Sequence, residues 1–159
     1  MSLTDTAPAA ITDFAGDHFW LSNFFPSPVE MDGALYVTVE NAFQAAKTLD
    51  RDARRAFETC GADESKMRGM QVALRHDWEA VKSDIMLALL REKFAIPALG
   101  RRLIATGTAE IVNRNVFGDT FWGVTRAGGR NELGRLLMQV RAEIAAAAAA
   151  HPRPERTPA

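Results

Sequence analysis

The chain has 159 residues, of which 47% are hydrophobic and 25% are charged, and its formal net charge is −1. This is the length and composition of one ordinary globular domain, and the absence of a Lys/Arg run predicts no general nucleic-acid or membrane surface. The single cysteine excludes an internal disulfide, and the three histidines lack the spacing of metal ligands. No stretch resembles a signal peptide or a bilayer-spanning helix, so we expect a cytoplasmic protein.

The N-terminal part of the chain combines a short tail with an aromatic cluster. Residues 1–10 are small and polar, and we expect them to form a flexible tail. Five aromatic residues then follow within a short span, around the polar pair Ser22-Asn23. Such a cluster forms either a plug in the core or the wall of a pocket for a flat heterocycle.

The segment 38–49 predicts a central amphipathic helix, with Thr38 as its N-cap. Its apolar face is formed by Val39, Ala42, Phe43 and Ala46. Its neighbouring polar stripe is formed by Glu40, Gln44 and Lys47. A helix that buries the apolar face therefore places a carboxylate, an amide and an ammonium along its border, where a half-buried site can form. The alternative is a solvated face with one helical salt bridge.

The remaining pattern predicts a mostly helical α+β fold. The segment 29–37 is expected to form a β-hairpin around an Asp32-Gly33 turn. Helical patterns follow at 51–59, 62–70, 74–94, 97–106 and from 131 onward, with a short strand at 109–113. Since there is no repeat or linker, we expect a single compact domain at 11–148 with a small N-terminal sheet, followed by a disordered tail at 149–159.

A loop rich in Gly, Asn and Asp precedes the last helix, at 114–131. It carries Asp119 and Trp122, and loops held between rigid elements often carry function. Its glycine-rich end leads into the helix start, where backbone amides can hold a phosphate with the help of Arg126 and Arg130. The alternatives are an ordinary turn, solvated arginines and a tryptophan that belongs to the core.

Six sequence blocks stand in a fixed order between Phe14 and Arg141. They are LSNF (21–24), VENAFQAAKT (39–48), LRHDW (74–78), KF (93–94), GDTFWG (118–123) and NELGRLLMQVR (131–141). Together they resemble the NADAR-domain family, which includes N-glycosidases of riboflavin intermediates. The resemblance implies a compact, mainly helical fold of the family's own type. It also implies hydrolysis of an N-glycosidic bond between ribose and a nitrogen base, without a metal or a cofactor.

The resemblance further implies a set of site residues. The family's functional positions correspond here to Glu40, Lys47, Trp78, Asp119 and Trp122. Three of the residues are expected to be catalytic: Glu40, Asp119 and Lys47. With the arginines of the glycine-rich loop added, the expected substrate-binding residues are Asn23, Gln44, Trp78, Trp122, Gly123, Arg126, Arg130 and Asn131. The chain departs from the family at Asn113 and Met70, where many members carry Glu and Arg, and these departures bear on substrate choice.

The chemistry of the bond agrees with these residue types. Breaking a C1′–N bond builds positive charge on the ribose, which a carboxylate stabilises while a second group assists the departing base and tryptophans stack on it. The leading hypothesis is a small-molecule substrate, a phosphoribosylamino-pyrimidine intermediate of riboflavin synthesis. The first alternative is removal of ADP-ribose from guanine in nucleic acid. The second is a binding module for ADP-ribose or NAD without turnover. The sequence predicts no membrane partner and no particular oligomeric state.

Overall fold

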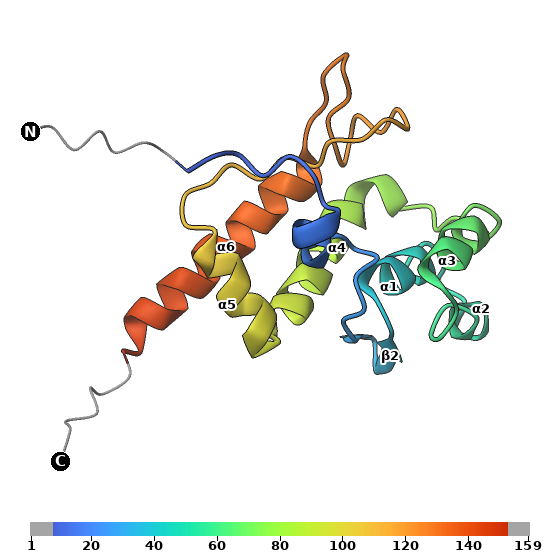
Figure 1. Ribbon diagram of the computed structural model, residues 1–159. Helices are drawn as coiled ribbons and strands as arrows, with labels where there is room; N and C mark the ends of the chain where they lie inside the picture. The colour runs from blue at the N-terminus through green and yellow to red at the C-terminus, as the bar shows by residue number, and fades with distance from the viewer. Residues whose placement is uncertain (1–7, 153–159) are drawn as a thin grey trace, which may run out of the picture.

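In the computed structural model, which describes residues 8–152, six α-helices follow a short β-hairpin (Figure 1). The elements are η1 Gly16–Leu21 (a 3-10 helix), β1 Val29–Met31, β2 Ala34–Tyr36, α1 Val39–Ala45, α2 Arg51–Arg55, α3 Ala62–Gly69, α4 Trp78–Ala95, α5 Pro97–Ala105 and α6 Glu132–Ala150. The mostly helical α+β fold with a small N-terminal sheet is thus confirmed. The tails expected at 1–10 and 149–159 fall mostly outside the described residues, and α6 continues two residues beyond position 148.

Three predicted elements differ from the structure. The helix expected at 51–59 ends at Arg55, and the long helix expected from 74 begins at Trp78. The strand expected at 109–113 is reduced to a single bridge between Ile111 and Ile11. On the edge away from Ile11, this segment bonds to the side chain of Asn131 instead of to a partner strand. Its Nδ2 donates to the Ile111 carbonyl at 2.9 Å, and its Oδ1 accepts from the Asn113 amide at 2.8 Å.

The hairpin forms as its turn residues predict. Asp32 and Gly33 both have positive φ, 53° and 80°, as the tight turn between twisted strands requires. The strands pair antiparallel with Val29 opposite Tyr36, and both of these side chains are buried. Arg54 of α2 bonds Asp32 Oδ2 at 2.6 Å, which fixes the turn against the neighbouring helix.

Helix α1 is buried along its entire length. Thr38 caps it as predicted, because its hydroxyl accepts from the Asn41 amide at 3.1 Å. The Asn41 side chain then donates to the carbonyls of Phe57 and Cys60, which ties the helix to the chain between α2 and α3. The polar stripe predicted as a helix border is therefore largely buried, and Glu40 and Gln44 are both inside the protein.

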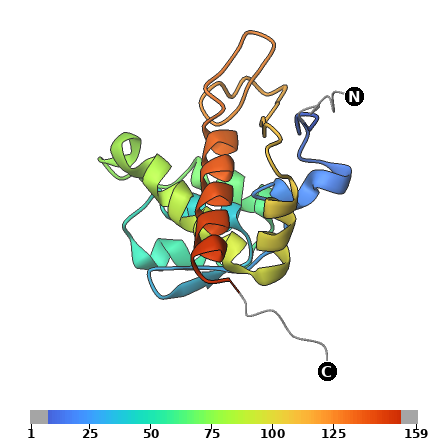
Figure 2. The same cartoon turned by 90° about the vertical axis from the view of Figure 1, so that its left-hand side faces the viewer.

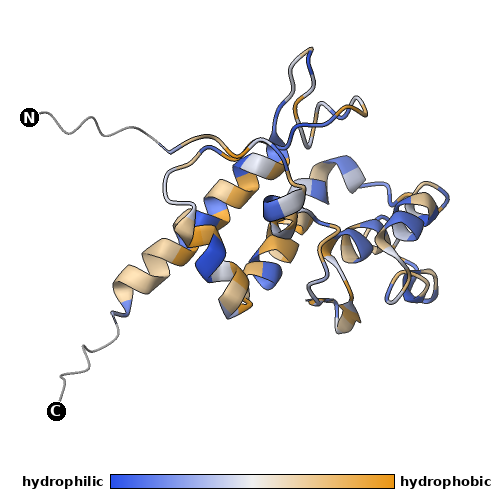
Figure 3. Ribbon diagram, viewed as in Figure 1, coloured by the Kyte–Doolittle hydropathy of each residue, from blue (hydrophilic) through white to orange (hydrophobic). Residues whose placement is uncertain are grey.

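Helices α4, α5 and α6 supply nearly half of the buried hydrophobic residues in the part of the chain that the structure describes. They pack against one another through buried residues such as Leu90, Leu103 and Leu137. The two views show the long loop after α5 rising from one end of this helical layer (Figures 1 and 2). The C-terminal part of α6 extends away from the body and carries exposed alanines (Figure 3). None of the helices within residues 8–152 is long and apolar enough to cross a membrane.

Candidate functional site

A pocket of about 490 Å³ opens where helix α1 meets α3, α4 and the long loop. Its walls also include the Ser22–Phe24 segment of the aromatic cluster. Seven of the predicted site residues line it: Asn23, Glu40, Gln44, Lys47, Trp78, Asp119 and Trp122. The aromatic cluster is therefore partly pocket wall and partly core, since Phe14 and Phe24 face the pocket whereas Trp20 is buried beneath. Residues far apart in the sequence meet in one cavity.

Glu40 is a buried carboxylate, with 8% of the residue exposed. Its Oε1 accepts from Gln44 Nε2 at 2.8 Å, and its backbone amide donates to the Asn23 carbonyl at 3.0 Å. No cation forms an ion pair with it among the described residues. Burial raises the pKa of Glu40, against the opposing effects of the Gln44 hydrogen bond and the charges of Lys66 and Lys47. A carboxylate of this kind is a stronger proton acceptor than one on the surface.

Cationic side chains outnumber carboxylates along the pocket wall. The four cations are Lys47, Lys66, Lys82 and Arg114, and the two carboxylates are Glu40 and Asp119. Burial lowers the pKa of Lys47, and the nearby Glu40 opposes this. Lys82 is already engaged, since its Nζ lies 2.5 Å from Glu79 Oε2 and 3.9 Å from the centroid of the Phe121 ring. The excess of positive charge favours an anionic ligand in the pocket.

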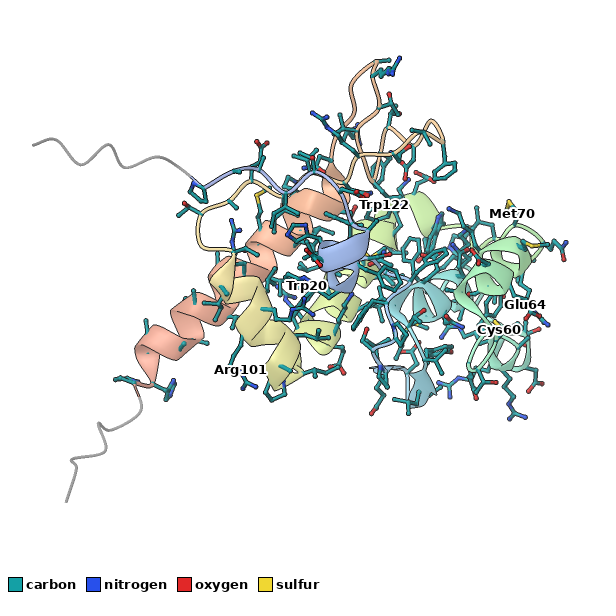
Figure 4. All side chains as sticks on the ribbon, in the orientation of Figure 1. Trp20, Cys60, Glu64, Met70, Arg101 and Trp122 are labelled. Carbon is teal, nitrogen blue, oxygen red and sulfur yellow. The ribbon has the colours of Figure 1, made fainter. Side chains whose placement is uncertain are left out.

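Three aromatic rings form a continuous wall. The centroid of Phe43 lies 5.0 Å from that of Trp78 and 5.3 Å from that of Trp122. Trp78 is mainly a core residue with one edge at the pocket, while Trp122 is only partly buried. Figure 4 shows Trp122 at the base of the long loop, whereas Met70 lies at the far edge of α3. Met70 is 74% exposed and does not line the pocket, so of the two family departures only Asn113 reaches the site.

Asp119 organises the loop that carries it. Its Oδ1 accepts from the amides of Phe121 and Trp122 at 3.0 and 2.9 Å. Its own amide donates to Asn115 Oδ1, and Asn115 Nδ2 donates back to the Asp119 carbonyl. Within the described part of the chain, the other carboxylate oxygen has no hydrogen-bond partner. A carboxylate fixed in this way is oriented before any ligand arrives.

Four predicted site residues lie outside the pocket: Gly123, Arg126, Arg130 and Asn131. A Cβ at Gly123 would fall 2.4 Å from the Asn113 carbonyl oxygen, so this glycine allows the close packing of the loop. The Arg130 guanidinium lies 5.3 Å from the centroid of the Phe121 ring and is exposed. Arg126 lines a separate hollow with Arg114 and Asn115. Asn131, as described above, bridges α6 to the 111–113 segment.

Two of the amides at the start of α6, where an anion site is predicted, already have backbone partners. A helix N-terminus binds an anion through its free amides. Here the Glu132 amide donates to the Phe121 carbonyl at 3.0 Å, and the Leu133 amide donates to the Trp122 carbonyl at 3.1 Å. The loop folds back over the helix start, so these two amides are not free for a ligand. The phosphate site expected there with Arg126 and Arg130 stays a prediction.

Sequence reasoning missed Lys66, Lys82 and Met86, which also line the pocket. Lys66 is placed by the approach of α3 to α1, which depends on Gly69. A Cβ at Gly69 would lie 1.8 Å from Gln44 Oε1, so any other residue here requires the Gln44 side chain or α3 to shift. The glycine within the helical pattern at 62–70 was the one sequence signal that this helix packs closely against another element. The sequence does not identify which element that is.

Known proteins share both the sequence pattern and the fold. The model of the NADAR domain matches residues 12–145. The N-glycosidase YbiA of Escherichia coli strain K12 is 36% identical over 140 residues, covering 81% of this chain and 83% of its own length. The NMR structure of E. coli YbiA gives a TM-score of 0.82 at 32% sequence identity, covering 93% of this chain and 92% of that chain.

Two further relatives differ in length. The N-glycosidase Npun_R5314 of Nostoc punctiforme is 33% identical over 130 residues, covering 77% of this chain and 83% of that protein. The riboflavin biosynthesis protein VVA0006 of Vibrio vulnificus is 35% identical over 140 residues, or 80% of this chain. The match covers only 36% of VVA0006, so the chain spans about a third of that protein.

Proposed function

Because the chain belongs to the NADAR domain family, we propose that it is an N-glycosidase, a hydrolase that cleaves the bond between a ribose and a nitrogen base. The observation that carries this proposal is Glu40, a buried carboxylate without an ion-pair partner among the described residues, in a pocket with an aromatic wall and a cationic wall. The names of the relatives, YbiA and Npun_R5314, support the same reaction class.

Glu40 is the principal catalytic group in this proposal. Positive charge develops on the ribose as the C1′–N bond breaks, and a carboxylate in a water-poor site stabilises that charge or takes a proton from the attacking water. The raised pKa of Glu40 suits it to accept this proton. Asp119 is the second carboxylate of the pocket, and Lys47, which follows the end of α1, is a pocket cation whose charge acts on Glu40.

The substrate that we propose is a phosphoribosylamino-pyrimidine intermediate of riboflavin synthesis. Its flat base suits the wall formed by Phe43, Trp78 and Trp122. Its phosphate suits Lys66 and Arg114, which replace the arginines first expected in this role. The name of VVA0006, a riboflavin biosynthesis protein, supports this substrate class.

The alternative substrate, ADP-ribose on guanine in nucleic acid, is favoured by one observation. A hollow of about 630 Å³ adjoins the pocket, shares Arg114 and Asn115 with it, and adds Arg126. A substrate with a second phosphate and a polynucleotide would extend beyond the pocket, and this hollow offers it a second guanidinium.

Turnover assays with the two substrates test the proposal. Release of the free base and ribose 5-phosphate, with EDTA present throughout, is the expected result for the first substrate. Glu40→Gln should lower kcat by about 10²–10³-fold, as the loss of one charge-stabilising group commonly does. Glu64→Gln is the matched control, because Glu64 is an exposed carboxylate on α3 bonded to Arg68. Absence of turnover with both substrates, together with tight binding of ADP-ribose, would instead identify a binding module.

A further inference from the structure

Lys93 is the most deeply buried charged side chain of the described residues, and the proposed reaction does not use it. It lies on α4 with 0% of the residue exposed. Its Nζ donates to the Ser22 carbonyl at 2.8 Å and lies 5.6 and 5.3 Å from the ring centroids of Phe25 and Phe94. No carboxylate lies within ion-pair distance of it in the part of the chain that the structure covers.

Burying an ammonium in this apolar position costs desolvation free energy, so we expect its hydrogen bond to have a function. Burial without a counter-charge lowers the pKa of Lys93 to about 7. A methionine would fill the same apolar space without the desolvation of a charge. The group to which Nζ donates therefore indicates what the lysine does.

The Ser22 carbonyl is the start of a tight turn at the pocket wall. The same oxygen accepts from the Phe25 amide at 3.1 Å, and the Ser22 hydroxyl accepts from the Phe24 amide at 3.1 Å. The two central residues of this turn, Asn23 and Phe24, both line the pocket. Lys93 thus fixes the turn from beneath while its centre faces the cavity.

The turn is in direct contact with the proposed catalytic carboxylate. The Asn23 carbonyl accepts from the Glu40 amide at 3.0 Å, in the first turn of α1. The Asn23 side chain contacts Met86 Sδ at 3.6 Å. Because Met86 and Lys93 are two helical turns apart on one face of α4, that helix holds the turn at two points.

We propose that Lys93 is a positioning residue of this site: it holds the Ser22–Phe25 turn against α4, and the turn sets the position of Glu40. The kinetic part of this inference rests on the proposed N-glycosidase function. The structural part does not, because the position of the turn is measurable without turnover.

The test compares Lys93→Met with Leu103→Ala. Leu103 is fully buried on α5 and does not line the pocket, so its truncation lowers stability without a contact to the turn. Lys93→Met should lower kcat by about tenfold or more with a much smaller change in KM, since a small displacement of a catalytic group has effects of this order. Its amide NMR signals at Asn23 and Glu40 should shift. Leu103→Ala should lower the melting temperature and leave kcat and these two signals unchanged.

A folded Lys93→Met protein with wild-type kcat and unshifted Asn23 and Glu40 signals would overturn the proposal. If that variant does not fold, Lys93→Gln takes its place, because its carboxamide still donates but is one bond shorter. Its kcat should then be lower than that of the wild type and the same two signals should shift; wild-type behaviour in both would mean that Lys93 only stabilises the fold. If the wild type turns over neither substrate, the proposed function fails, and the amide signals alone decide the positioning role.

Discussion

Glu40 is held where its charged form is least stable. Its residue is almost fully buried, and the Gln44 amide is the only side chain that bonds it among the described residues. Replacing a buried charged residue by a neutral isostere often stabilises a protein, so a buried charge that persists commonly has a functional role. The burial that raises the pKa of Glu40 therefore also lowers the stability of the fold.

This leads to a prediction about pH. The pKa of Glu40 is raised in the folded protein, so between the unfolded and the folded pKa the folded state binds more protons than the unfolded state. The contribution of Glu40 to the free energy of unfolding is fully present below the pKa of the unfolded state. It is lost as the pH rises through the pKa of the folded state. Glu40→Gln, which can still accept from Gln44, should have a higher melting temperature than the wild type at neutral pH, and the difference should vanish below about pH 4.

Melting curves of both proteins across this pH range make the measurement, with the exposed Glu64→Gln as the control. A lower melting temperature of Glu40→Gln at neutral pH would mean that the carboxylate is stabilised in the fold rather than merely tolerated there.

A second prediction at this scale concerns the phosphate. Lys66 lines the pocket, whereas Arg130 lies outside it over the Phe121 ring. Lys66→Ala should raise KM for a phosphoribosyl substrate far more than for its dephosphorylated counterpart, because the two share the scissile bond and differ only in the phosphate. Arg130→Ala should change both KM values little, since exposed charges contribute little. Equal effects of Lys66→Ala on both substrates would remove Lys66 from the phosphate site.

The approach of α3 to α1 decides the shape of one pocket wall. These two helices meet at Gly69, whose backbone lies against the Gln44 carboxamide. Gln44 in turn donates a hydrogen bond to Glu40. The packing of α3 against α1 therefore affects the position of the proposed catalytic carboxylate through the Gln44 side chain. A helical glycine is usually unfavourable by about 1 kcal/mol relative to alanine, and here it leaves room for the Gln44 carboxamide.

Gly69→Ala should therefore lower activity although alanine is the better helix former. The added Cβ would lie 1.8 Å from Gln44 Oε1, so either the carboxamide or α3 must move. Gly61→Ala is the matched control, because nothing lies within 4 Å of a Cβ at that position and its φ is negative. We expect kcat/KM to fall by about tenfold or more for Gly69→Ala and to stay near wild type for Gly61→Ala. Wild-type kinetics of Gly69→Ala would show that Gln44 need not be held in place.

The whole molecule divides into a helical scaffold and a site at one side of it. Helices α4, α5 and α6 pack against one another in a helical layer (Figures 1 and 2). The pocket forms where α1, α3 and the long loop meet the N-terminal half of α4. The end of α6 takes no part in either. We propose that residues 11–148 are sufficient for the catalytic domain.

A chain ending at residue 148 should retain wild-type kcat and melting temperature, because the residues from 145 to 150 are exposed alanines. A chain ending at residue 139 should unfold at a lower temperature, since it loses Val140, which is buried, and Ile144, which packs against the core. Thermal melts and turnover assays of the two shortened chains make the comparison. A large loss of stability in the longer one would extend the domain to the end of α6.

The sequence was sufficient to predict those features that depend only on residues close to one another in the chain. The Asp32-Gly33 turn and the Thr38 cap follow from φ preference and side-chain reach, and both form as predicted. At the start of α6, two of the amides expected to hold an anion bond instead to the carbonyls of Phe121 and Trp122, residues brought there by the fold of the loop. Hydrogen bonds of this kind join residues that the fold brings together, so no short sequence motif predicts them. The position of Lys66 near α1 could not be predicted for the same reason.

The bonds between Asn115 and Asp119 close the chain between them into a small ring. Each residue donates to the other, and the Phe117 amide also donates to Asn115 Oδ1. Val116 and Phe117 lie at the tip of this ring, 92% and 87% exposed, and Phe117 borders the pocket. The tip is therefore free to change in sequence, in evolution or by design, while the carboxylate at its base keeps its orientation. In the proposed N-glycosidase, substitutions at positions 116 and 117 should therefore change which bases are recognised while Asp119 keeps its orientation.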